Sequence, residues 1–366
     1  MRIRRVEAVV RTVSSRTLST AYGAGVSRRT HAFVRVETDT GMDGIGEASP
    51  LPHFTGEAAE TIAWVIREKF GPALAGVDPW DLEAVHAALD RTLPHHTTAK
   101  HAVVTAVWDL ISKAAGLPAG YLMGGRRAEA LPVVGGLGIA DIDETVRQAV
   151  EQVQQGLRTL KLKIGTNPKR DKDAVAAVRD AVGPDIALRV DANQHYTVKE
   201  AIQLIRSLEP FDVQYVEQPI RAGDPRELAR VTQATGLRIA ADESLYGPRE
   251  ALALLREQAA DVLVVKLIKC GGPYRGRQLL AMAEAAGLPC VLVSPYETTV
   301  GAAANLHLAA AAPNVPFAVE VGVFAIPDDP ARGVVIEQGQ AHIPKGPGLG
   351  IAVDPDLFAM REARHP

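Results

Sequence analysis

Hydrophobic and polar residues alternate along the first fifty positions as they do in antiparallel strands. The runs at 6–13 (VEAVVRTV) and 31–48 (HAFVRVETDTGMDGIGEA) carry this pattern, and a Thr-Gly turn signal interrupts the second. Apolar residues at three- and four-residue spacing then predict helices over 57–70, 78–93 and 98–116. Together these elements predict a small α+β domain that covers residues 1–125.

From residue 132 onward, short apolar strands are separated by amphipathic helices. Strand-helix alternation indicates parallel pairing, and eight such strands predict a closed (β/α) barrel of the TIM type over residues 126–325. A doubly wound open sheet is the alternative, but no G-x-G-x-x-G follows a first strand. The segment 326–366, rich in Pro and Gly, is expected to pack back on the first domain. The expected strands are 132–138, 158–165, 185–193, 213–219, 237–244, 261–269, 289–297 and 317–323.

Two lysines share one face of the strand at 159–165 (TLKLKIG). Successive side chains of a strand point to opposite sides, so Lys161 and Lys163 lie together while apolar residues fill the other face. Taken alone, this pattern fits a surface edge strand whose lysines lie in water. The residues that end the following strands favour a different interpretation.

Five charged residues occur near the carboxyl ends of successive strands, 24 to 28 residues apart. Each gap equals one strand-helix unit, and a parallel barrel brings the carboxyl ends of its strands to one mouth. We therefore expect all five to surround one site. They are Lys163, Asp191, Glu217, Asp242 and Lys266.

Three neighbouring carboxylates cannot all be buried and ionised without a cation. Oxygen ligands without His or Cys favour Mg²⁺, with Mn²⁺ possible, over Zn²⁺ or Cu²⁺; three separate strand-end caps are the alternative. Lys163 and Lys266 would flank the metal, where a lysine of lowered pKa could take a proton next to a carboxylate. Lys161 would add charge for the substrate carboxylate or for this pKa effect.

Composition excludes several classes of protein. The 366 residues carry 40 basic and 43 acidic side chains without a dense basic block, which argues against nucleic-acid binding. Cys270 and Cys290 have no disulfide or zinc spacing, which fits a reducing cytoplasm. No apolar run is long enough to predict a membrane span, and the basic residues 1–16 are interpreted as a folded strand and not as a transit peptide.

The ordered motifs resemble the enolase superfamily, specifically its muconate-lactonizing-enzyme (muconate cycloisomerase) subgroup. The resemblance implies a modified (β/α)7β barrel beneath an α+β capping domain, Mg²⁺ on the three carboxylates, Lys163 and Lys266 as the catalytic pair, a small carboxylate substrate and a homo-oligomer. It places Lys161, Asn193 and Glu243 at supporting positions. The matching segments are KLKIG (161–165), RVDANQ (189–194), VEQP (216–219), ADES (241–244), VVKLIKCGGP (264–273) and ETTVG (297–301).

A muconate-type cycloisomerase is the main prediction for the reaction. Lys-Cys-Gly-Gly-Pro at 269–273 is similar to such enzymes, and Glu320 falls where they carry an eighth-strand glutamate, although the Leu-Phe-Gly-Pro that should follow is absent. The segment 49–57 (SPLPHFTGE) resembles the one that covers the pocket in dipeptide epimerases, whose eighth-strand Asp-x-Asp is missing here. An amino-acid or dipeptide racemase or epimerase is therefore the alternative. A noncatalytic, metal-stabilised binding protein is the alternative from another class.

Further residues are candidates for contact with the substrate. The segment 19–31 is placed like a mobile loop that closes the pocket, with Gly23 and Gly25 as possible hinges. For each candidate, a solvated loop position or ordinary packing is the competing interpretation. The candidates are Arg28 and Arg29, which could bind a second substrate carboxylate, His53 and Phe54, which could face the substrate, and Tyr296 and Glu297, which end the seventh strand and are expected to line the mouth.

Overall fold

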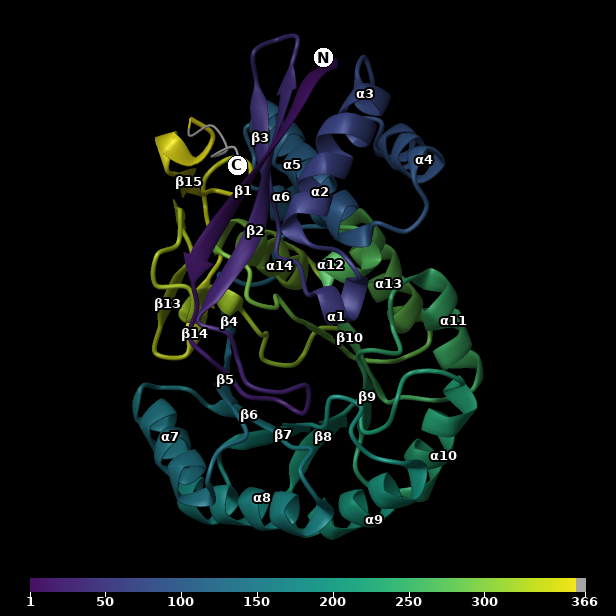
Figure 1. The fold of residues 1–366 in the computed structure, drawn as a ribbon, viewed down its shortest axis with the longest axis vertical. Coiled ribbons are helices and arrows are strands. Elements are labelled where there is room, and N and C mark those ends of the chain that lie inside the picture. Colours follow the sequence, from purple (N-terminus) through teal and green to yellow (C-terminus); the bar gives the residue numbers. More distant parts are fainter. Residues whose placement is uncertain (360–366) are drawn as a thin grey trace, which may run out of the picture.

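The structure, a computed structural model, describes residues 1–359. A capping domain lies above a barrel, and after the barrel the chain returns to the cap (Figure 1). The cap holds a three-stranded antiparallel sheet in the order β1-β2-β3, which confirms the expected first sheet. Its elements are β1 (Ile3–Ser14), β2 (Arg28–Thr38), β3 (Asp43–Ala48), α1 (Pro52–Thr55), α2 (Ala59–Val65), a π-helical turn (Ile66–Phe70), α3 (Gly71–Leu74), α4 (Leu82–Thr92), α5 (Thr97–Ala115) and α6 (Ala119–Met123).

Helix α5 packs against β3 at very short distance. A Cβ atom on Gly44 would lie 2.0 Å from the carbonyl oxygen of Ala106, and one on Gly46 would lie 1.9 Å from that of Ala102. Only glycine allows this approach. The helix ends as expected at Gly116, which adopts a left-handed conformation (φ 68°).

The barrel contains seven parallel strands that run in sequence order from β5 to β11. Helices cover their outer side (Figure 1), and this arrangement confirms the predicted TIM-like fold. The strands are β5 (Val134–Leu137), β6 (Thr159–Lys163), β7 (Ala187–Asp191), β8 (Val213–Glu217), β9 (Ile239–Ala241), β10 (Val262–Val265) and β11 (Cys290–Leu292). The helices are α7 (Ile142–Gln154), α8 (Pro168–Val182), α9 (Val198–Leu208), a 3-10 turn (Glu209–Phe211), α10 (Pro225–Ala234), α11 (Pro248–Arg256), α12 (Leu267–Cys270), α13 (Pro273–Ala285) and α14 (Thr299–Ala311).

The eighth strand, expected over 317–323, is shorter than the sequence pattern indicates. Val319 bridges to Val133 on one edge of the sheet, and Glu320 bridges to Val293 on the other. These bridges close the barrel. The chain then forms a 3-10 turn at Gly322–Ala325, and a Cβ atom on Gly322 would lie 2.5 Å from the Cα of Tyr296. Gly322 thus lies directly against the loop that follows β11, and the eighth strand stops pairing with its neighbours at this point.

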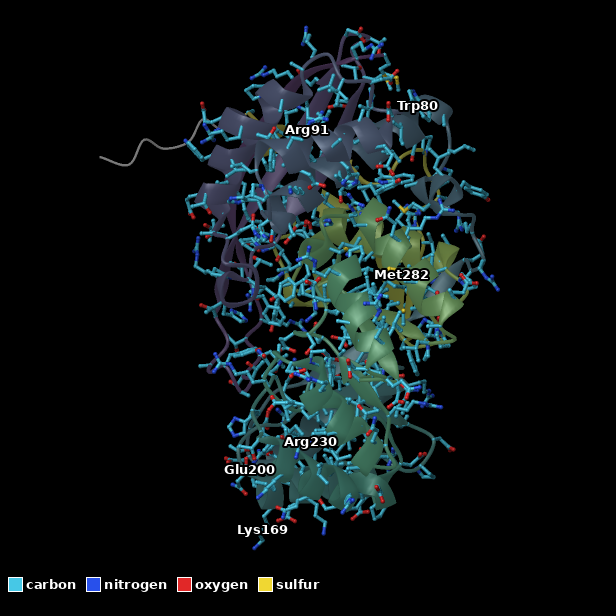
Figure 2. All side chains as sticks on the ribbon, turned by 90° about the vertical axis from the view of Figure 1, so that its right-hand side faces the viewer. Trp80, Arg91, Lys169, Glu200, Arg230 and Met282 are labelled. Carbon is cyan, nitrogen blue, oxygen red and sulfur yellow. The ribbon has the colours of Figure 1, made fainter. Side chains whose placement is uncertain are left out.

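Below its mouth, the barrel interior combines apolar side chains with one fully buried arginine, Arg189, whose guanidinium lies 5.0 Å from the Tyr215 ring. Tyr215, Val262, Val264, Val291 and Phe317 belong to a separate buried cluster inside the strands. Charged side chains cover the outer surface, where Lys169, Glu200 and Arg230 lie on α8, α9 and α10, at the end of the molecule far from Trp80 and Arg91 of the cap (Figure 2). Within residues 1–359, no helix is long and apolar enough to cross a membrane.

The segment from residue 326 to 359 contacts both parts of the fold. Arg11 of the cap donates to the Leu357 carbonyl at 2.6 Å, and the Ser14 amide donates to Asp328 at 2.6 Å. The strand β14 (Gln340–His342) pairs with β4 (Ala130–Pro132), which precedes the barrel. Residues 360–366, which were also expected to pack on the first domain, lie outside the residues that the structure describes. The segment forms β12 (Ala331–Arg332), β13 (Val335–Glu337), β14 (Gln340–His342), β15 (Ala352–Val353) and a 3-10 turn (Pro355–Leu357).

Candidate active site

Strand pairing brings the predicted charged residues to one end of the barrel. Lys163 pairs with Asp191 between β6 and β7, and Asp191 pairs with Glu217 between β7 and β8. Asp242 directly follows β9, and Lys266 directly follows β10 and caps the start of helix α12. Because all these strands are parallel, the five residues lie at the carboxyl ends of neighbouring strands.

Lys161 is a buried member of this group and does not lie in water as on an edge strand. Its side chain is 4% exposed, and its Nζ lies 2.8 Å from Glu217, 2.9 Å from Glu320 and 3.2 Å from Asp191. One ammonium group therefore joins carboxylates from β7, β8 and the closing segment. This contact also brings Glu320 to the barrel mouth.

The two lysines of the predicted catalytic pair approach the site from opposite sides. Lys163 Nζ lies 2.5 Å from Asp191 Oδ2 and 3.3 Å from Asn193 Oδ1. Lys266 Nζ donates to Asp242 Oδ2 and lies 4.6 Å from the centroid of the Phe54 ring. Lys163 ends β6 and Lys266 follows β10, and the three strands β7 to β9 lie between these two strands in the sheet. The lysines therefore face each other across the carboxylates.

The carboxylates form a buried region of negative charge that fits a divalent cation. Asp191, Glu217 and Asp242 are at most 1% exposed. Burial and the neighbouring Asp191 hold the pKa of Glu217 well above its usual range. One buried oxygen of Glu243, the residue after Asp242, accepts no hydrogen bond among the described residues. An unsatisfied buried carboxylate oxygen is costly, and a hard cation nearby would compensate the negative charge of this region.

Among the described residues, the carboxylates of this region do not by themselves form a metal-binding cluster. Across residues 1–359, no group of three or more His, Cys, Asp or Glu side chains is gathered closely enough to hold a metal. Lysines contact the carboxylates instead: Lys161 contacts Glu217, Lys163 contacts Asp191, and Lys266 and Lys269 contact Asp242. A bound cation would therefore replace ammonium contacts on the same oxygens.

The pKa of Lys266 is raised, whereas the sequence predicted a lowered lysine pKa. Burial lowers it, but the carboxylates of Asp242, Glu217 and Glu243 outweigh burial and hold the pKa above its usual value. These are the groups whose charge a divalent cation would compensate. The structure therefore does not show, at Lys266, the lowered pKa that we expected from the sequence.

A tyrosine that the sequence did not single out contacts the site from the loop between β1 and β2. Tyr22 donates from its hydroxyl to Glu243 Oε1 at 2.6 Å, and Gln194 Nε2 donates to the same hydroxyl at 2.6 Å. The loop, residues 15–27, extends from the cap into the barrel mouth (Figure 1). Within it, Thr20 and Gly23 exchange backbone hydrogen bonds of 3.0 Å, and Gly23 has φ 127°. The one signal for Tyr22 was its place in a glycine-containing loop.

Aromatic side chains of α1 pack against this loop. The Tyr22 ring lies 4.9 Å from the His53 ring, and His53 lies 5.1 Å from Phe54. Tyr246 donates to the Phe54 carbonyl at 2.5 Å and holds α1 over the barrel. His53 and Phe54 therefore stand beside the site, and their contact with a substrate stays a prediction.

The two candidate arginines have different surroundings. Arg29 is half-buried, and its guanidinium carbon lies 3.4 Å from the centroid of the Tyr296 ring. Arg28, at the start of β2, is exposed. Tyr296 itself adopts φ 55° where the chain leaves the seventh strand. The structure thus places Arg29 against Tyr296, which follows the seventh strand, whereas Arg28 is exposed.

Glu297 corrects the expectation that it lines the mouth. Its carboxylate is fully buried, lies 2.9 Å from His101 Nε2 and accepts from Asn305 at 2.9 Å. The left-handed backbone at Tyr296 turns the next side chain toward α5 and α14. Glu297 therefore joins the cap to the barrel and does not meet substrate.

Sequence reasoning also missed Lys269 and Glu47. Lys269 is 1% exposed and donates to Asp242 Oδ1 at 2.6 Å, so it supports a carboxylate of the site. Glu47 is fully buried on β3 and accepts from the Thr298 and Gly301 amides at 2.9 Å, at the start of α14. A pattern of alternating residues marks Glu47 only as an interior position and gives no sign of its distant partners.

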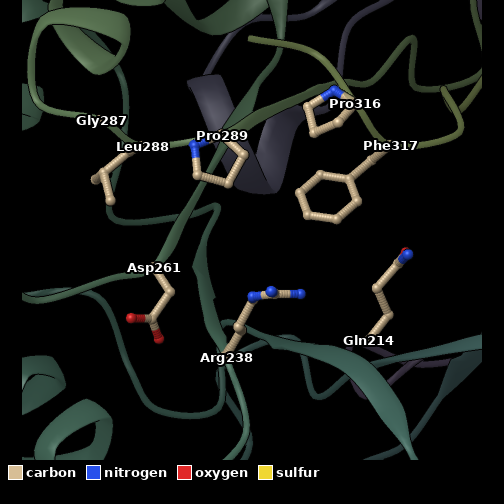
Figure 3. A pocket seen from close by; sticks show the side chains of 8 residues that line it. All are labelled: Gln214, Arg238, Asp261, Gly287, Leu288, Pro289, Pro316 and Phe317. Carbon is tan, nitrogen blue, oxygen red and sulfur yellow. The ribbon is translucent and has the colours of Figure 1, made fainter.

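A cavity at the other end of the barrel does not belong to this site. It has a volume of about 580 Å³ and is lined by residues at the amino ends of the strands (Figure 3). Arg238 precedes β9, Asp261 precedes β10 and Pro289 precedes β11. The cavity therefore opens away from the carboxylates.

Two domain families match the chain. Residues 5–124 match the "Mandelate racemase / muconate lactonizing enzyme, N-terminal domain", and residues 144–357 match "Enolase C-terminal domain-like". The chain is 36% identical over 324 residues to a hydrophobic dipeptide epimerase of Enterococcus faecalis, which covers 88% of this chain and 91% of the relative. It is 32% identical over 337 residues to a chloromuconate cycloisomerase of Delftia acidovorans, covering 90% and 91%.

Solved structures of such relatives share the whole fold. An N-succinyl Arg/Lys racemase from Bacillus cereus superposes with a TM-score of 0.94 at 33% identity, covering 97% of this chain and 96% of that one. The structure of the Enterococcus faecalis dipeptide epimerase complexed with Mg and the dipeptide L-Leu-L-Tyr superposes with a TM-score of 0.93 at 34% identity. The match covers 96% of this chain and 100% of that one. The chain therefore belongs to the mandelate racemase and muconate lactonizing enzyme family of the enolase superfamily, and it is an isomerase.

Proposed function

We propose that this protein is a Mg²⁺-dependent racemase or epimerase that moves the α-proton of an N-substituted amino acid or a dipeptide. The observation that carries the proposal is the opposed pair Lys163 and Lys266, each beside a different carboxylate on either side of the site. Inversion of a carbon centre requires one group to remove a proton from one face and another to deliver a proton to the other face. Two opposed lysines meet this requirement.

Each side chain of the site has a part in this proposal. Asp191, Glu217 and Asp242 would hold Mg²⁺, which supplies positive charge beside the substrate carboxylate and so stabilises the charge that develops when the α-proton leaves. Lys161 adds a positive charge beside two of the three carboxylates, Asp191 and Glu217.

The proton transfer itself would use the two opposed lysines. One lysine, as the neutral amine, takes the α-proton and becomes an ammonium ion. The other, as an ammonium ion, gives its proton to the opposite face of the same carbon and becomes neutral. Reversal of the two roles converts the other enantiomer. Asn193 contacts Lys163, and Phe54 packs beside Lys266, so each amine has a defined direction.

The comparisons favour this reaction over the cycloisomerisation that was the main prediction from the sequence. The relatives with 33–36% identity include epimerases and racemases of dipeptides and N-succinyl amino acids, while chloromuconate cycloisomerases stand at 32%. The segment 49–57 forms α1 beside the site, in keeping with its similarity to dipeptide epimerases. The noncatalytic alternative has no support in a family of isomerases.

We further propose that the enzyme works in the cytoplasm as a homo-oligomer. The two cysteines, Cys270 and Cys290, are free and buried, which agrees with a reducing compartment. The homo-oligomer stays a prediction from the family resemblance.

Incubation in D₂O tests the proposed reaction. The panel contains L-amino acids, dipeptides, N-acyl and N-methylated amino acids and cis,cis-muconates, each followed by proton NMR and chiral chromatography. We expect deuterium at the α-carbon and the opposite configuration in one class of amino-acid derivative. The double variant Lys163→Ala, Lys266→Ala is the control and should show neither. Conversion of a muconate to a lactone, with no exchange in any amino-acid derivative, would overturn the proposal.

A further inference from the structure

We propose that the cavity at the amino end of the barrel is a second binding site, which takes a small aliphatic carboxylate. Arg238 would contact the carboxylate, and Arg189 would attract it from behind the cavity wall. The inference goes beyond the proposed function and does not depend on it, because the cavity lies at the other end of the barrel from the opposed lysines. It follows from a buried cation without an acidic partner, from the polar groups of the cavity and from its apolar lining.

Arg189 is a fully buried cation without an acidic partner among the described residues. It is 0% exposed, and in residues 1–359 no carboxylate oxygen lies within 4.0 Å of its nitrogens. Its Nε donates to Gln214 Oε1 at 2.7 Å, and its Nη1 donates to the Ala318 carbonyl at 2.9 Å. Its Nη2 makes no hydrogen bond with the described residues. A buried charge of this kind is costly unless an anion compensates it.

The cavity lies next to this guanidinium. Gln214 accepts from Arg189, and the Phe317 ring centroid lies 5.5 Å from the guanidinium carbon; both residues line the cavity (Figure 3). Because the amide oxygen of Gln214 accepts from Arg189, its NH₂ group remains as a donor for a ligand. Charges interact strongly across a protein interior, where screening is weak. An anion in the cavity would therefore be attracted by Arg189 and by the amide of Gln214.

A second cation lines the cavity from the solvent side. Arg238, just before β9, is exposed, and none of its nitrogens lies within 4.0 Å of a carboxylate oxygen in the described chain. Among the described residues that line the cavity, Asp261 alone is acidic, and its Oδ2 already accepts from the Ile239 amide at 2.8 Å. Two cations against one carboxylate leave the cavity with a positive balance. A planar guanidinium suits a carboxylate because it can donate two parallel N–H groups.

Apolar residues form the rest of the lining and define the kind of carboxylate. They are Leu288, Pro289, Pro316 and Phe317, and the volume of about 580 Å³ is typical of small-molecule sites. An inorganic anion would leave these side chains in water, whereas a short aliphatic chain would cover them. The ligand could be a simple carboxylic acid or a free amino acid, whose ammonium group would meet Asp261. Both share a carboxylate on a short apolar chain.

Three probes of the same shape test this site on the full-length protein treated with EDTA. Isovalerate is the anionic probe, isovaleramide is its neutral counterpart, and L-leucine adds an ammonium group. Ligand-observed NMR titration gives each dissociation constant for wild type, Arg238→Gln and Gln214→Glu. The matched control for charge is Arg230→Gln, which removes an exposed arginine from the outer surface of α10.

We expect wild-type protein to bind isovalerate at least roughly tenfold more tightly than isovaleramide, as for a hydrogen bond to a charged group. Arg238→Gln should weaken isovalerate binding by a similar factor. Gln214→Glu should abolish it, because the new carboxylate would pair with Arg189 and repel the probe. Arg230→Gln should bind like wild type. Tighter binding of L-leucine than of isovalerate would identify a free amino acid as the ligand, and weaker binding a simple carboxylic acid.

Two results would overturn the inference. One is equal affinity of wild-type protein for isovalerate and isovaleramide, or no saturable binding of any probe, a result that needs no variant to fold. The other is isovalerate binding that is unchanged in both Arg238→Gln and Gln214→Glu, which would place the anion elsewhere on the protein. Neither result bears on α-proton exchange, so the proposed function would stand or fall by its own test.

Discussion

Tyr22 and Glu243 join the two halves of the enzyme across the barrel mouth, with 2.6 Å between the tyrosine hydroxyl and the carboxylate. Tyr22 belongs to the loop 15–27 of the cap, and Glu243 follows the strand β9 of the barrel. The same hydroxyl accepts from Gln194. This phenol group therefore ties the loop to the site, in addition to backbone hydrogen bonds such as that from the Ile139 amide to the Ser19 carbonyl.

The first prediction concerns this contact. Tyr22→Phe keeps the ring against His53 but removes the hydrogen bond, so the loop should close less often over the substrate. We expect a higher KM and kcat/KM lower by roughly tenfold, in line with about 1.5 kcal/mol for a hydrogen bond to a charged group. Steady-state kinetics measure this change. Tyr121→Phe, at a ring that is 51% exposed, is the control and should have wild-type kinetics; an equal loss in both variants would argue against the loop contact.

The second prediction concerns the carboxylate that fixes the cap to the barrel. Glu47 accepts from two amides at the start of α14 and from the Thr298 hydroxyl, and it lies 2.7 Å from His31. Glu47→Gln should reduce the free energy of unfolding by about 3 kcal/mol, as expected when a buried charged contact is broken. Urea denaturation measures this loss. Glu144→Gln on the exposed face of α7 is the control, and a stability equal to wild type in both variants would contradict the role of Glu47.

The contribution of Glu47 should also depend on pH. Burial raises the pKa of Glu47, but the His31 contact and the hydrogen bonds from Thr298 outweigh burial and hold it below the ordinary value of 4.5. A carboxyl whose pKa is lowered on folding stabilises the protein above its unfolded pKa, and this contribution is lost as the pH falls through the folded pKa. The stability difference between wild type and Glu47→Gln should therefore be full at neutral pH and shrink progressively below pH 4.5. A difference that grows on acidification would contradict this assignment.

The third prediction concerns Mg²⁺. Chelation should abolish activity, and added Mg²⁺ should restore it and also raise the melting temperature, because a ligand that binds only the folded state stabilises it. Glu217→Gln removes one charged ligand and should weaken both effects. Differential scanning calorimetry against Mg²⁺ concentration gives a measure that is independent of turnover.

A matched variant makes the metal test specific. Glu320→Gln alters a carboxylate that contacts Lys161 but is not among the three proposed ligands. It should keep the stabilisation by Mg²⁺. Equal Mg²⁺ responses in wild type and Glu217→Gln, or full activity of metal-free enzyme, would contradict the assignment of the carboxylates.

Much of the fold follows from the sequence because its signals are periodic. The regular spacing of Asp191, Glu217 and Asp242 identifies successive strand ends, and parallel pairing then brings them to one mouth. The alternation at 159–165 likewise places Lys161 and Lys163 on one face. These inferences need only local geometry and the repeat of the barrel.

The remaining features depend on contacts between distant segments. The direction of the Glu297 side chain depends on the left-handed backbone of Tyr296 and on a contact with His101, nearly two hundred residues earlier in the chain. Tyr22 reaches Glu243 only because the loop of the cap extends into the barrel. Periodicity shows which face a side chain occupies, but it does not show which partner it meets across the fold.

The most direct test of the opposed lysine pair follows the α-proton in the single variants Lys163→Ala and Lys266→Ala. Each variant, supplied separately with the L- and D-forms of an accepted substrate in D₂O, is analysed by NMR for exchange and by chiral chromatography for configuration. We expect inversion to fall by roughly a hundredfold or more in both variants, the usual contribution of a positioned acid or base. We also expect each variant to exchange the proton of one enantiomer only, with retained configuration, and the two variants to differ in which enantiomer that is. Exchange of the same enantiomer by both variants, or inversion at the wild-type rate in either, would contradict the two-lysine account.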